Sequence, residues 1–569
     1  MPKILLFVPL AALWGLIGVL AAQSRPKADL ILISGKVWTV NPARPKAEAV
    51  AIQGSRILAV GSNQEILDLA GPQTRRIDLQ GQAVFPGFID SHAHFLGLGK
   101  EKRQVNLRYA GSWENVVERV AAAAARVPKG TWVLGRGWHQ EKWNPKPAVL
   151  VAGFPVHDLL SRAVPDHPVL LTHGSGHALL VNARAMELAG ISDATPNPPG
   201  GEVLRNTRGQ AIGVFTENAE DLVWEAYGRD QSRLSPAERE AETIKEIEAA
   251  DRECLANGIT TFHDAGVGFS TLDLYRKMVD AGRIRVRLWA MVNESNEQLR
   301  RRLGSYKQIG YGENQLTVRG IKRLLDGALG SRSAWMKEGY ADRPGNTGLN
   351  TIPLSDLKQT AQIALQNGWQ LCVHAIGDRA NQELLDLYES ILPSPSASES
   401  RWRIEHAQHL DPQDIPRFAR LGVIAVMQGV HCTSDGPFIV SRLGEKRARS
   451  GAYVWRSLLD ARARISNGTD APVEELNPLA CFYSSVTRRQ GNGEYFYPEQ
   501  RMTRSEALES YTIQGAYAGF EENIKGSIEP GKLADLVVLS RDIMTVPEEE
   551  IPQAEVRMTI IGGQIRFSK

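Results

Sequence analysis

Hydrophobic residues in the middle of the chain occur in short runs that alternate with longer amphipathic segments. Eight runs have the character of buried strands: 87–94, 258–266, 285–292, 320–327, 369–378, 402–408, 423–429 and 463–472. Segments with helical periodicity, such as 236–256 and 354–367, separate several of them. Strands that alternate with helices indicate parallel βα units, and eight such strands close a TIM-like barrel. The pattern therefore predicts an α/β protein built on a (β/α)8 barrel.

Both ends of the chain carry short β-rich runs with apolar alternation. They lie at 29–40, 48–60, 533–539 and 556–567. Each group is too small to bury a core alone, so we expect the two ends to assemble together. The predicted arrangement is a small β-sandwich made from residues 28–85 and 525–569, with the barrel occupying residues 86–524.

The interval between the first and second predicted strands, residues 95–257, is much longer than an ordinary barrel loop. A segment inserted after a barrel strand emerges at the C-terminal mouth of the barrel, where the active sites of this fold lie. We therefore expect a lid or specificity region here.

The first 24 residues differ from the rest. A single early lysine, Lys3, precedes an uncharged run from Ile4 to Ser24, and Val19-Leu20-Ala21 provides a small-residue cleavage site. This layout predicts a secretory signal peptide and an exported protein, periplasmic or extracellular. The alternative is an uncleaved membrane anchor formed by residues 4–24, because the run is long enough to span a bilayer.

Composition narrows the class of function. The chain of 569 residues is long enough for two or more structural units. Lys plus Arg is 66 and Asp plus Glu is 64, without a basic stripe, so nucleic acid is not an expected partner. We expect a small-molecule substrate, and a homo-oligomer remains possible. The four cysteines are too few for a disulfide framework and are interpreted as small buried residues.

Residues able to bind metal ions recur near the ends of the predicted barrel strands. His92 and His94 end strand one, and because they are two residues apart they point to the same face. One such residue alone is weak evidence for a metal site. Imidazole and carboxylate are the natural ligands of zinc, however, and the candidate residues taken together predict a metal site at the barrel mouth. The six candidates are His92, His94, Lys322, His374, His406 and Asp470.

The segments that carry these residues occur in a recognisable order. They are PGFIDSHAH, IKRLLDGALGSRSA, HAIGDRA, RIEHAQ and NGTDAPVEELNPL, followed by GSIEPGKLADLVVLSRD. From about residue 28 onward the chain resembles the amidohydrolase superfamily, specifically its family-3 branch, which includes enzymes similar to N-substituted formamide deformylases.

The resemblance implies two divalent ions, most often zinc, at the barrel mouth. His92, His94 and Asp470 would hold one ion, and His374 and His406 the other. Lys322 matches a lysine that in many relatives is carbamylated and bridges both ions. An unmodified ammonium has no lone pair for a metal, so the carbamate is the form that fits. The alternative for Lys322 is an ordinary ion pair with Asp326.

The chemistry implied is attack by metal-activated water on an amide-type bond. Asp470 would act as general base and then as general acid towards the leaving nitrogen. A second hypothesis keeps the fold but uses one metal ion for deamination or ester hydrolysis. A third is an inactive, metal-bound protein that only binds ligands.

Three further residues are candidates for substrate contacts. His177 lies in THGSGHALLVN, which resembles a family segment, and either contacts substrate or orients its loop. Trp138, in the insertion, either walls the pocket or packs in a core. His431, after strand seven, matches a family position that could face substrate.

Overall fold

The computed structural model describes residues 27–392 and 397–569. The predicted signal peptide or anchor, residues 1–24, lies outside the described residues. Within the described ranges, no helix is long and apolar enough to cross a membrane.

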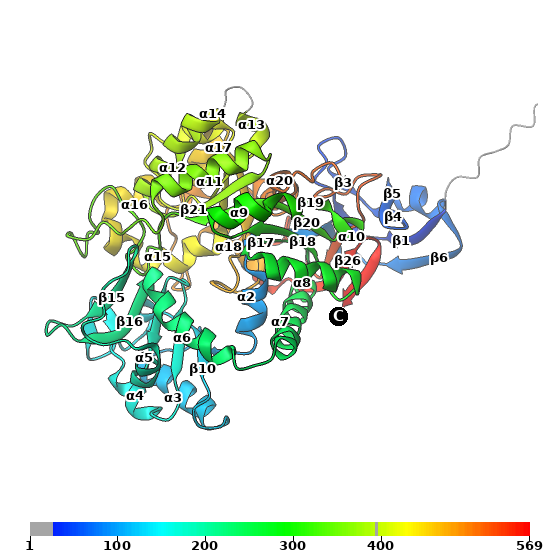
Figure 1. Cartoon of the computed structure of the whole chain (residues 1–569). Coiled ribbons are helices and arrows are strands. Elements are labelled where there is room, and N and C mark those ends of the chain that lie inside the picture. The colour runs from blue at the N-terminus through cyan, green and yellow to red at the C-terminus, as the bar shows by residue number, and fades with distance from the viewer. Residues whose placement is uncertain (1–26, 393–396) are drawn as a thin grey trace, which may run out of the picture.

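A barrel of eight parallel strands forms the centre of the molecule (Figure 1). Each strand pairs with its neighbour in chain order, and each overlaps one of the eight predicted runs, so the TIM-like fold is confirmed. β20 (Leu316–Leu324) starts at Leu316 rather than at residue 320, because its first residues already pair with β18 (Arg287–Val292). The short β19 (Gln308–Gly310) also pairs with β20, at Val318. The strands are β8 (Phe88–Ala93), β17 (Ile259–Val267), β18 (Arg287–Val292), β20 (Leu316–Leu324), β21 (Gln370–Ala375), β22 (Arg403–His406), β23 (Ile424–Gln428) and β24 (Arg464–Gly468).

The barrel nearly closes between its first and last strands. Just beyond β24, the Asp470 amide donates to the His92 carbonyl at 2.8 Å, and the His94 amide donates to the Ala471 carbonyl at 2.7 Å. Close approach of the two backbones requires a glycine at position 468, since a Cβ there would lie 2.5 Å from the His92 nitrogen. This closure places Asp470 beside His92 and His94, although they are far apart in the sequence.

Helices cover the outside of the barrel and bury an apolar face against it. On α12 (Asp378–Ile391), for example, Leu384, Leu385 and Tyr388 are fully buried. The outer helices include α8 (Phe269–Asp280), α9 (Asn296–Arg302), α11 (Leu354–Gln366), α12 (Asp378–Ile391), α14 (Ile415–Leu421) and α17 (Trp455–Asp460).

The two ends of the chain meet on one side of the barrel, at the right of Figure 1. There β7 (Ala83–Pro86) pairs antiparallel with β25 (Leu536–Leu539), joining an N-terminal strand to a C-terminal one. A second sheet, which contains β1 (Ala28–Ile33) and β4 (Ala49–Gln53), contributes Leu30 and Ile52 to a core shared with Leu536. Division of the chain into domains at residues 85 and 525 stays a prediction.

The insertion after β8 forms a body of its own, at the lower left of Figure 1. Its six strands follow the order β15-β16-β14-β13-β10-β9. The strands are β9 (Val105–Asn106), β10 (Val133–Trp138), β13 (Val169–His173), β14 (Ala178–Val181), β15 (Gly201–Arg205) and β16 (Ala211–Glu217). We call this body the lid.

The lid is connected to the barrel by helices at both of its ends. α7 (Pro236–Ala256) leads back into β17 and packs against α2 (Phe95–Glu101), which follows β8. Ser235 starts α7 with a capping box that includes Glu238. Residues 95–257 therefore comprise a lid and the two helices that support it.

Candidate active site

The six predicted ligand residues converge at the C-terminal mouth of the barrel. All are buried except His94, whose side chain is 37% exposed. The His92 and His406 rings are 4.7 Å apart, and those of His374 and His406 are 4.5 Å apart. Asp470 Oδ1 lies 3.2 Å from His94 Nε2 and 3.6 Å from His92 Nε2.

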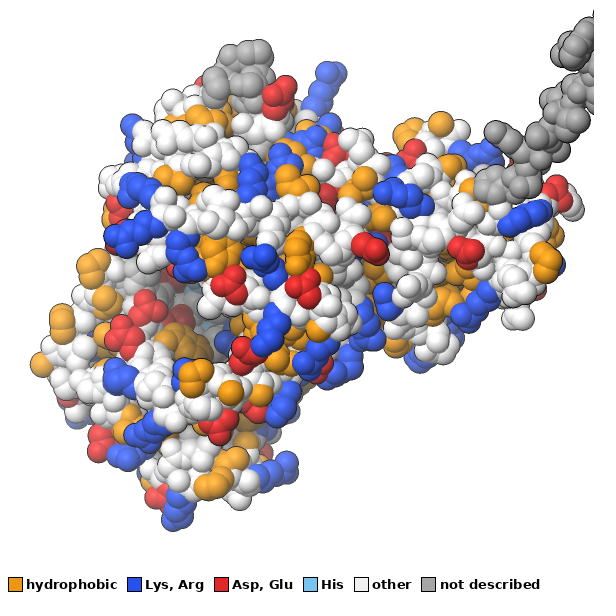
Figure 2. Space-filling view, turned by 45° about the vertical axis from the view of Figure 1, so that its right-hand side comes forward, with side chains coloured by type: hydrophobic (Ala, Val, Ile, Leu, Met, Phe, Trp, Pro, Cys, Tyr) orange, Lys and Arg blue, Asp and Glu red, His pale blue; other side chains and the backbone are white. Residues whose placement is uncertain are grey.

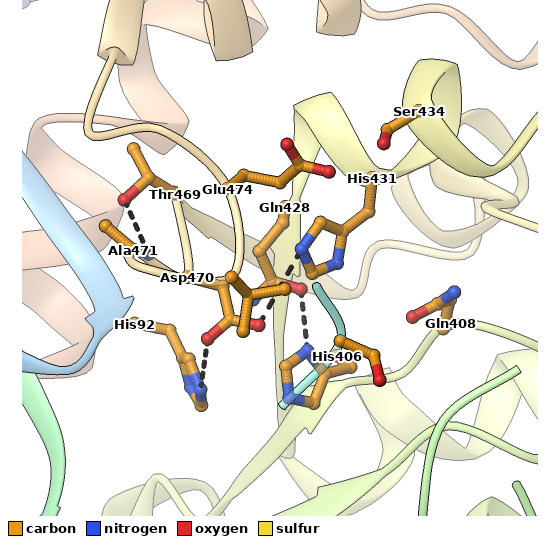
Figure 3. A network of polar contacts seen from close by, with 12 residues as sticks. His92, His406, Gln408, Gln428, His431, Ser434, Thr469, Asp470, Ala471 and Glu474 are labelled. Carbon is orange, nitrogen blue, oxygen red and sulfur yellow. Dashed lines mark hydrogen bonds and ion pairs between the residues drawn. The ribbon is translucent and has the colours of Figure 1, made fainter. Parts of the chain in front are cut away.

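The most compact set within the described residues consists of His92, His406 and Asp470. One potential ligand atom from each lies within 4.8 Å of the others. The set combines members of the two predicted groups, and His94 and His374 lie beside it. Figure 3 shows the His92, His406 and His431 rings around the Asp470 carboxylate.

Two of these residues have unusual backbone conformations. His406 has φ of 76° and Asp470 has φ of 58°, in the left-handed region that residues other than glycine rarely adopt. In a regular strand, neighbours point to opposite faces. Because His406 departs from the strand conformation, both its ring and the adjacent Glu405 side chain contact His92. Such strain concentrates at functional sites.

Buried acceptors fix the orientation of the imidazoles. Glu405 accepts a hydrogen bond from His92 Nδ1, and the fully buried Arg403 binds Glu405 through two nitrogens, at 2.6 and 2.9 Å. Gln428 Oε1 is 2.8 Å from His406 Nδ1. Carboxylate and amide partners of this kind set the tautomer of metal-binding histidines. On both rings the opposite nitrogen, Nε2, makes no hydrogen bond to another described residue.

The electrostatics of the site favour metal binding. Burial lowers the pKa of His92 to about 4 and holds the pKa of His374 and His406 well below the ordinary value, so these rings are neutral and retain lone pairs. Burial opposes ionisation of Asp470, but the contact with His94 and the other imidazoles holds its pKa well below the usual range.

An orphaned pair of atoms supports the same interpretation. His92 Nε2 and Asp470 Oδ1 are buried without a hydrogen-bond partner among the described residues. Unsatisfied buried polar atoms are costly, and a divalent cation would satisfy both.

Lys322 is buried on β20 and faces the same site. It has no ion pair within 4 Å among the described residues, so the alternative of a salt bridge to Asp326 is wrong. Asp326 instead accepts three backbone N–H groups, from Trp335, Ile376 and Gly377. Burial lowers the pKa of Lys322 from its ordinary value.

The three predicted substrate contacts have different environments. His177 precedes β14 and its ring lies 5.0 Å from that of His374. His431, on α15 (Gly429–Leu443), has Nε2 3.7 Å from Asp470 Oδ2. Trp138 is fully buried in the core of the lid and donates to the Leu171 carbonyl at 2.9 Å. It lines neither cavity described below, so the core-packing alternative is correct for Trp138.

Two cavities meet at the cluster. The first is small, about 50 Å3, and lies between the lid and α15, lined by Lys142, Ser434 and Glu474 among others. The second, of about 620 Å3, is lined by Lys322 and Glu217 among others. Figure 2 shows the surface hollowed between the lid and the barrel, with acidic side chains at the rim. The residues that line both cavities are Ser175, His177, His374, His406, Asp470 and Val473.

Sequence reasoning missed the residues that hold the predicted ones in place: Arg403, Glu405, Gln428 and Glu217. A signal existed for the first two, because paired charges within an otherwise apolar strand are rarely buried without a partner. Glu217 and Gln428 gave no comparable signal.

Comparison with known proteins identifies the class to which this fold and site belong. The chain belongs to the amidohydrolase family, whose model matches residues 75–567. It is a metal-dependent hydrolase that acts on carbon–nitrogen bonds.

Individual relatives extend over nearly the whole chain. It is 31% identical to Protein LONG AFTER FAR-RED 3 of Arabidopsis thaliana, over 97% of this chain and 94% of the relative. It is 29% identical to the N-substituted formamide deformylase of Arthrobacter pascens, over 95% of this chain and 98% of the relative. An uncharacterized metal-dependent hydrolase from Pyrococcus horikoshii has a similar structure, with TM-score 0.71 and 26% identity over 91% of this chain and 99% of that one.

Proposed function

We propose that the protein hydrolyses a non-peptide amide bond of a small molecule, such as a formamide or another acylated amine. The observation that carries the proposal is the buried Asp470 carboxylate, surrounded by imidazoles where two cavities meet. The likeness to an enzyme named for N-substituted formamides supports this class of substrate.

The cofactor proposed is a pair of divalent ions, most often zinc in sites of this ligand type. His92, His94 and Asp470 would hold one ion, and His374 and His406 the other. Such ions supply Lewis acidity, which polarises a carbonyl and acidifies water. The compactness of His92, His406 and Asp470 favours a second candidate, a one-metal hydrolase, and counting the bound ions decides between them.

Lys322 is proposed to carry a carbamate. Its buried amine, with a lowered pKa, is more readily neutral, and a neutral amine adds to carbon dioxide with loss of one proton. The product is an anion, which suits a position between cations better than an ammonium does.

The residues of the chain then have separate tasks. Asp470 accepts the proton of the attacking water and returns it to the leaving nitrogen, which must be protonated to depart. Its Oδ1 faces His92 and His94, so Oδ2, on the side of His431, is the oxygen available for that transfer. The two cavities offer separate space for the acyl and amine portions of a substrate.

A substrate screen with metal analysis tests the proposal. Protein purified without chelators is assayed against N-substituted formamides, larger N-acyl amines, esters and cyclic imides, with elemental analysis of the same sample. We expect about two ions per chain and turnover of amides. Turnover of esters alone, or full activity without metal, would contradict it.

We also propose that the protein is exported through its first 24 residues. N-terminal sequencing of the protein recovered from the periplasm or medium is expected to start shortly after Ala21 or Ala22. Recovery of the intact N-terminus in the membrane fraction would instead support an anchor.

A further inference from the structure

A histidine and a glutamate of the lid form a pair directly beside the candidate metal cluster. Ala178 of β14 lies opposite Thr216 of β16 in the antiparallel ladder. One residue beyond this pair, His177 precedes β14 and Glu217 ends β16, and their side chains are in contact. His177 Nδ1 is 2.8 Å from Glu217 Oε2, and His177 lines both cavities.

The other oxygen of Glu217 contacts the barrel. Ser333, in the loop after β20, donates its hydroxyl hydrogen to Glu217 Oε1. The approach is close enough that a Cβ on Gly327 would lie 2.1 Å from that same oxygen. The Gly327 carbonyl in turn is 3.3 Å from His374 Nε2. The Glu217 carboxylate is therefore buried at the seam between lid and barrel, in contact with both.

Glu217 is held in this place against its backbone preference. Its φ of 51° and ψ of −130° lie in a region populated almost only by glycine. Residues persist in such conformations only where the surroundings over-determine them, and they cluster at functional sites. A glutamate at a position where glycine would be relaxed indicates a role for its side chain.

We propose that Glu217 is a positioning residue that presents His177 Nε2 to the substrate where the two cavities meet. Because Nδ1 is committed to the carboxylate, Nε2 is the ring nitrogen left for a ligand. His177 then contacts the substrate, and Glu217 acts through it. The activity assays of this inference rest on the proposed function, whereas its crystallographic test does not.

The side chain and the backbone strain can be separated experimentally. Glu217→Gln keeps the shape and removes the charge, whereas Glu217→Gly removes the side chain and relaxes the backbone. We expect both to lower kcat/KM by about 10- to 100-fold, a typical effect of losing a partner that orients a histidine. Relief of the backbone strain in Glu217→Gly should offset part of the stability lost with the His177 and Ser333 contacts, so its melting temperature should stay close to that of the parent. Metal content should be unchanged in both variants.

A double-mutant cycle distinguishes positioning from general support. If Glu217 acts through His177, Glu217→Gln should cause no further loss in a His177→Ala background. Glu202→Gln serves as a matched control: Glu202 lies on the neighbouring strand β15, paired with Thr216, and faces Arg343 of the barrel at 4.0 Å. It should leave kcat/KM unchanged.

A crystal structure supplies a readout that needs no substrate. The His177 ring should keep its orientation in the metal-loaded parent and turn away in Glu217→Gly. An unmoved ring, additive losses in the cycle, or metal loss in proportion to activity would overturn the inference. Failure of the parent to hydrolyse any amide would refute the proposed function and leave the crystallographic test intact.

Discussion

His92 and His406 of the barrel mouth and His177 of the lid occupy opposite electrostatic environments within one site. At the barrel mouth, burial lowers the pKa of His92 to about 4 and holds that of His406 well below the ordinary value. In the lid, burial alone would lower the pKa of His177, but the Glu217 carboxylate raises it above the ordinary value. Neighbours rather than residue type therefore determine which form each ring takes.

This difference corresponds to a division of labour. Neutral rings with a free nitrogen are suited to hold metal, and they come from barrel strands whose positions the fold fixes. A ring beside a carboxylate is suited to donate a hydrogen bond, and it comes from the lid, which lines both cavities. The predictions below test this division between barrel and lid, from the largest expected effect to the smallest.

Removing the metal, or Lys322, should have the largest effect. Dialysis against a chelator should abolish activity, and added zinc should restore it. Lys322→Ala should lose most metal and activity, and acetate or bicarbonate should restore part of the activity by replacing the missing anion. Metal content and turnover are measured on the same samples. An unmodified lysine in a well-resolved, metal-loaded crystal structure would exclude the carbamate.

Asp470→Asn should leave the geometry but remove the proton acceptor. We expect kcat to fall by roughly 10²- to 10⁴-fold, the usual contribution of a positioned acid or base, with only a modest loss of metal. The measurement is kcat and metal occupancy on one folded preparation. Near-normal turnover at full occupancy would show that the base lies elsewhere.

The barrel half of the site could be predicted from sequence because the barrel fold determines which residues lie together. Once eight strands are recognised, residues at their C-terminal ends must meet, and His92, His374 and His406 do so. The same reasoning could not show that Glu405 also reaches His92. Strict alternation would point Glu405 away from the face used by His406, and only the left-handed φ of His406 lets both enter the site.

The contacts of the lid residues were harder to predict from the sequence. Its strands follow no barrel rule, so the register that places His177 opposite Glu217 depends on tertiary packing. Trp138 illustrates the difficulty: an aromatic residue near polar motifs is compatible with both a pocket wall and a core, and it lies in the core. The small sheets at the chain ends were foreseen as elements because their alternation is local.

Gln428 offers a test of the barrel side that leaves the lid untouched. Its amide oxygen accepts from His406 Nδ1, so Gln428→Leu should weaken metal affinity by about 10- to 100-fold, as expected for an outer partner of a ligand. Gln428→Glu keeps an acceptor and is the matched control. Metal affinity is measured by competition with a chelating dye. Equal metal affinity in the parent and in both Gln428 variants would show that the acceptor does not orient His406.

The pH dependence of stability should distinguish His177 of the lid from His92 of the barrel. Since the folded pKa of His177 is raised above its unfolded value of about 6.5, its pair with Glu217 stabilises the fold fully below that pH. The contribution disappears as the pH rises through the folded pKa. The melting temperature of metal-free parent should therefore exceed that of His177→Ala by more at about pH 5.5 than at about pH 9.

His92, with its lowered pKa, contributes with the opposite sign but is present in both proteins, so it cancels in the difference. A difference that is constant with pH would mean that His177 does not gain a proton in the folded protein, and the contrast between barrel and lid would then rest on geometry alone.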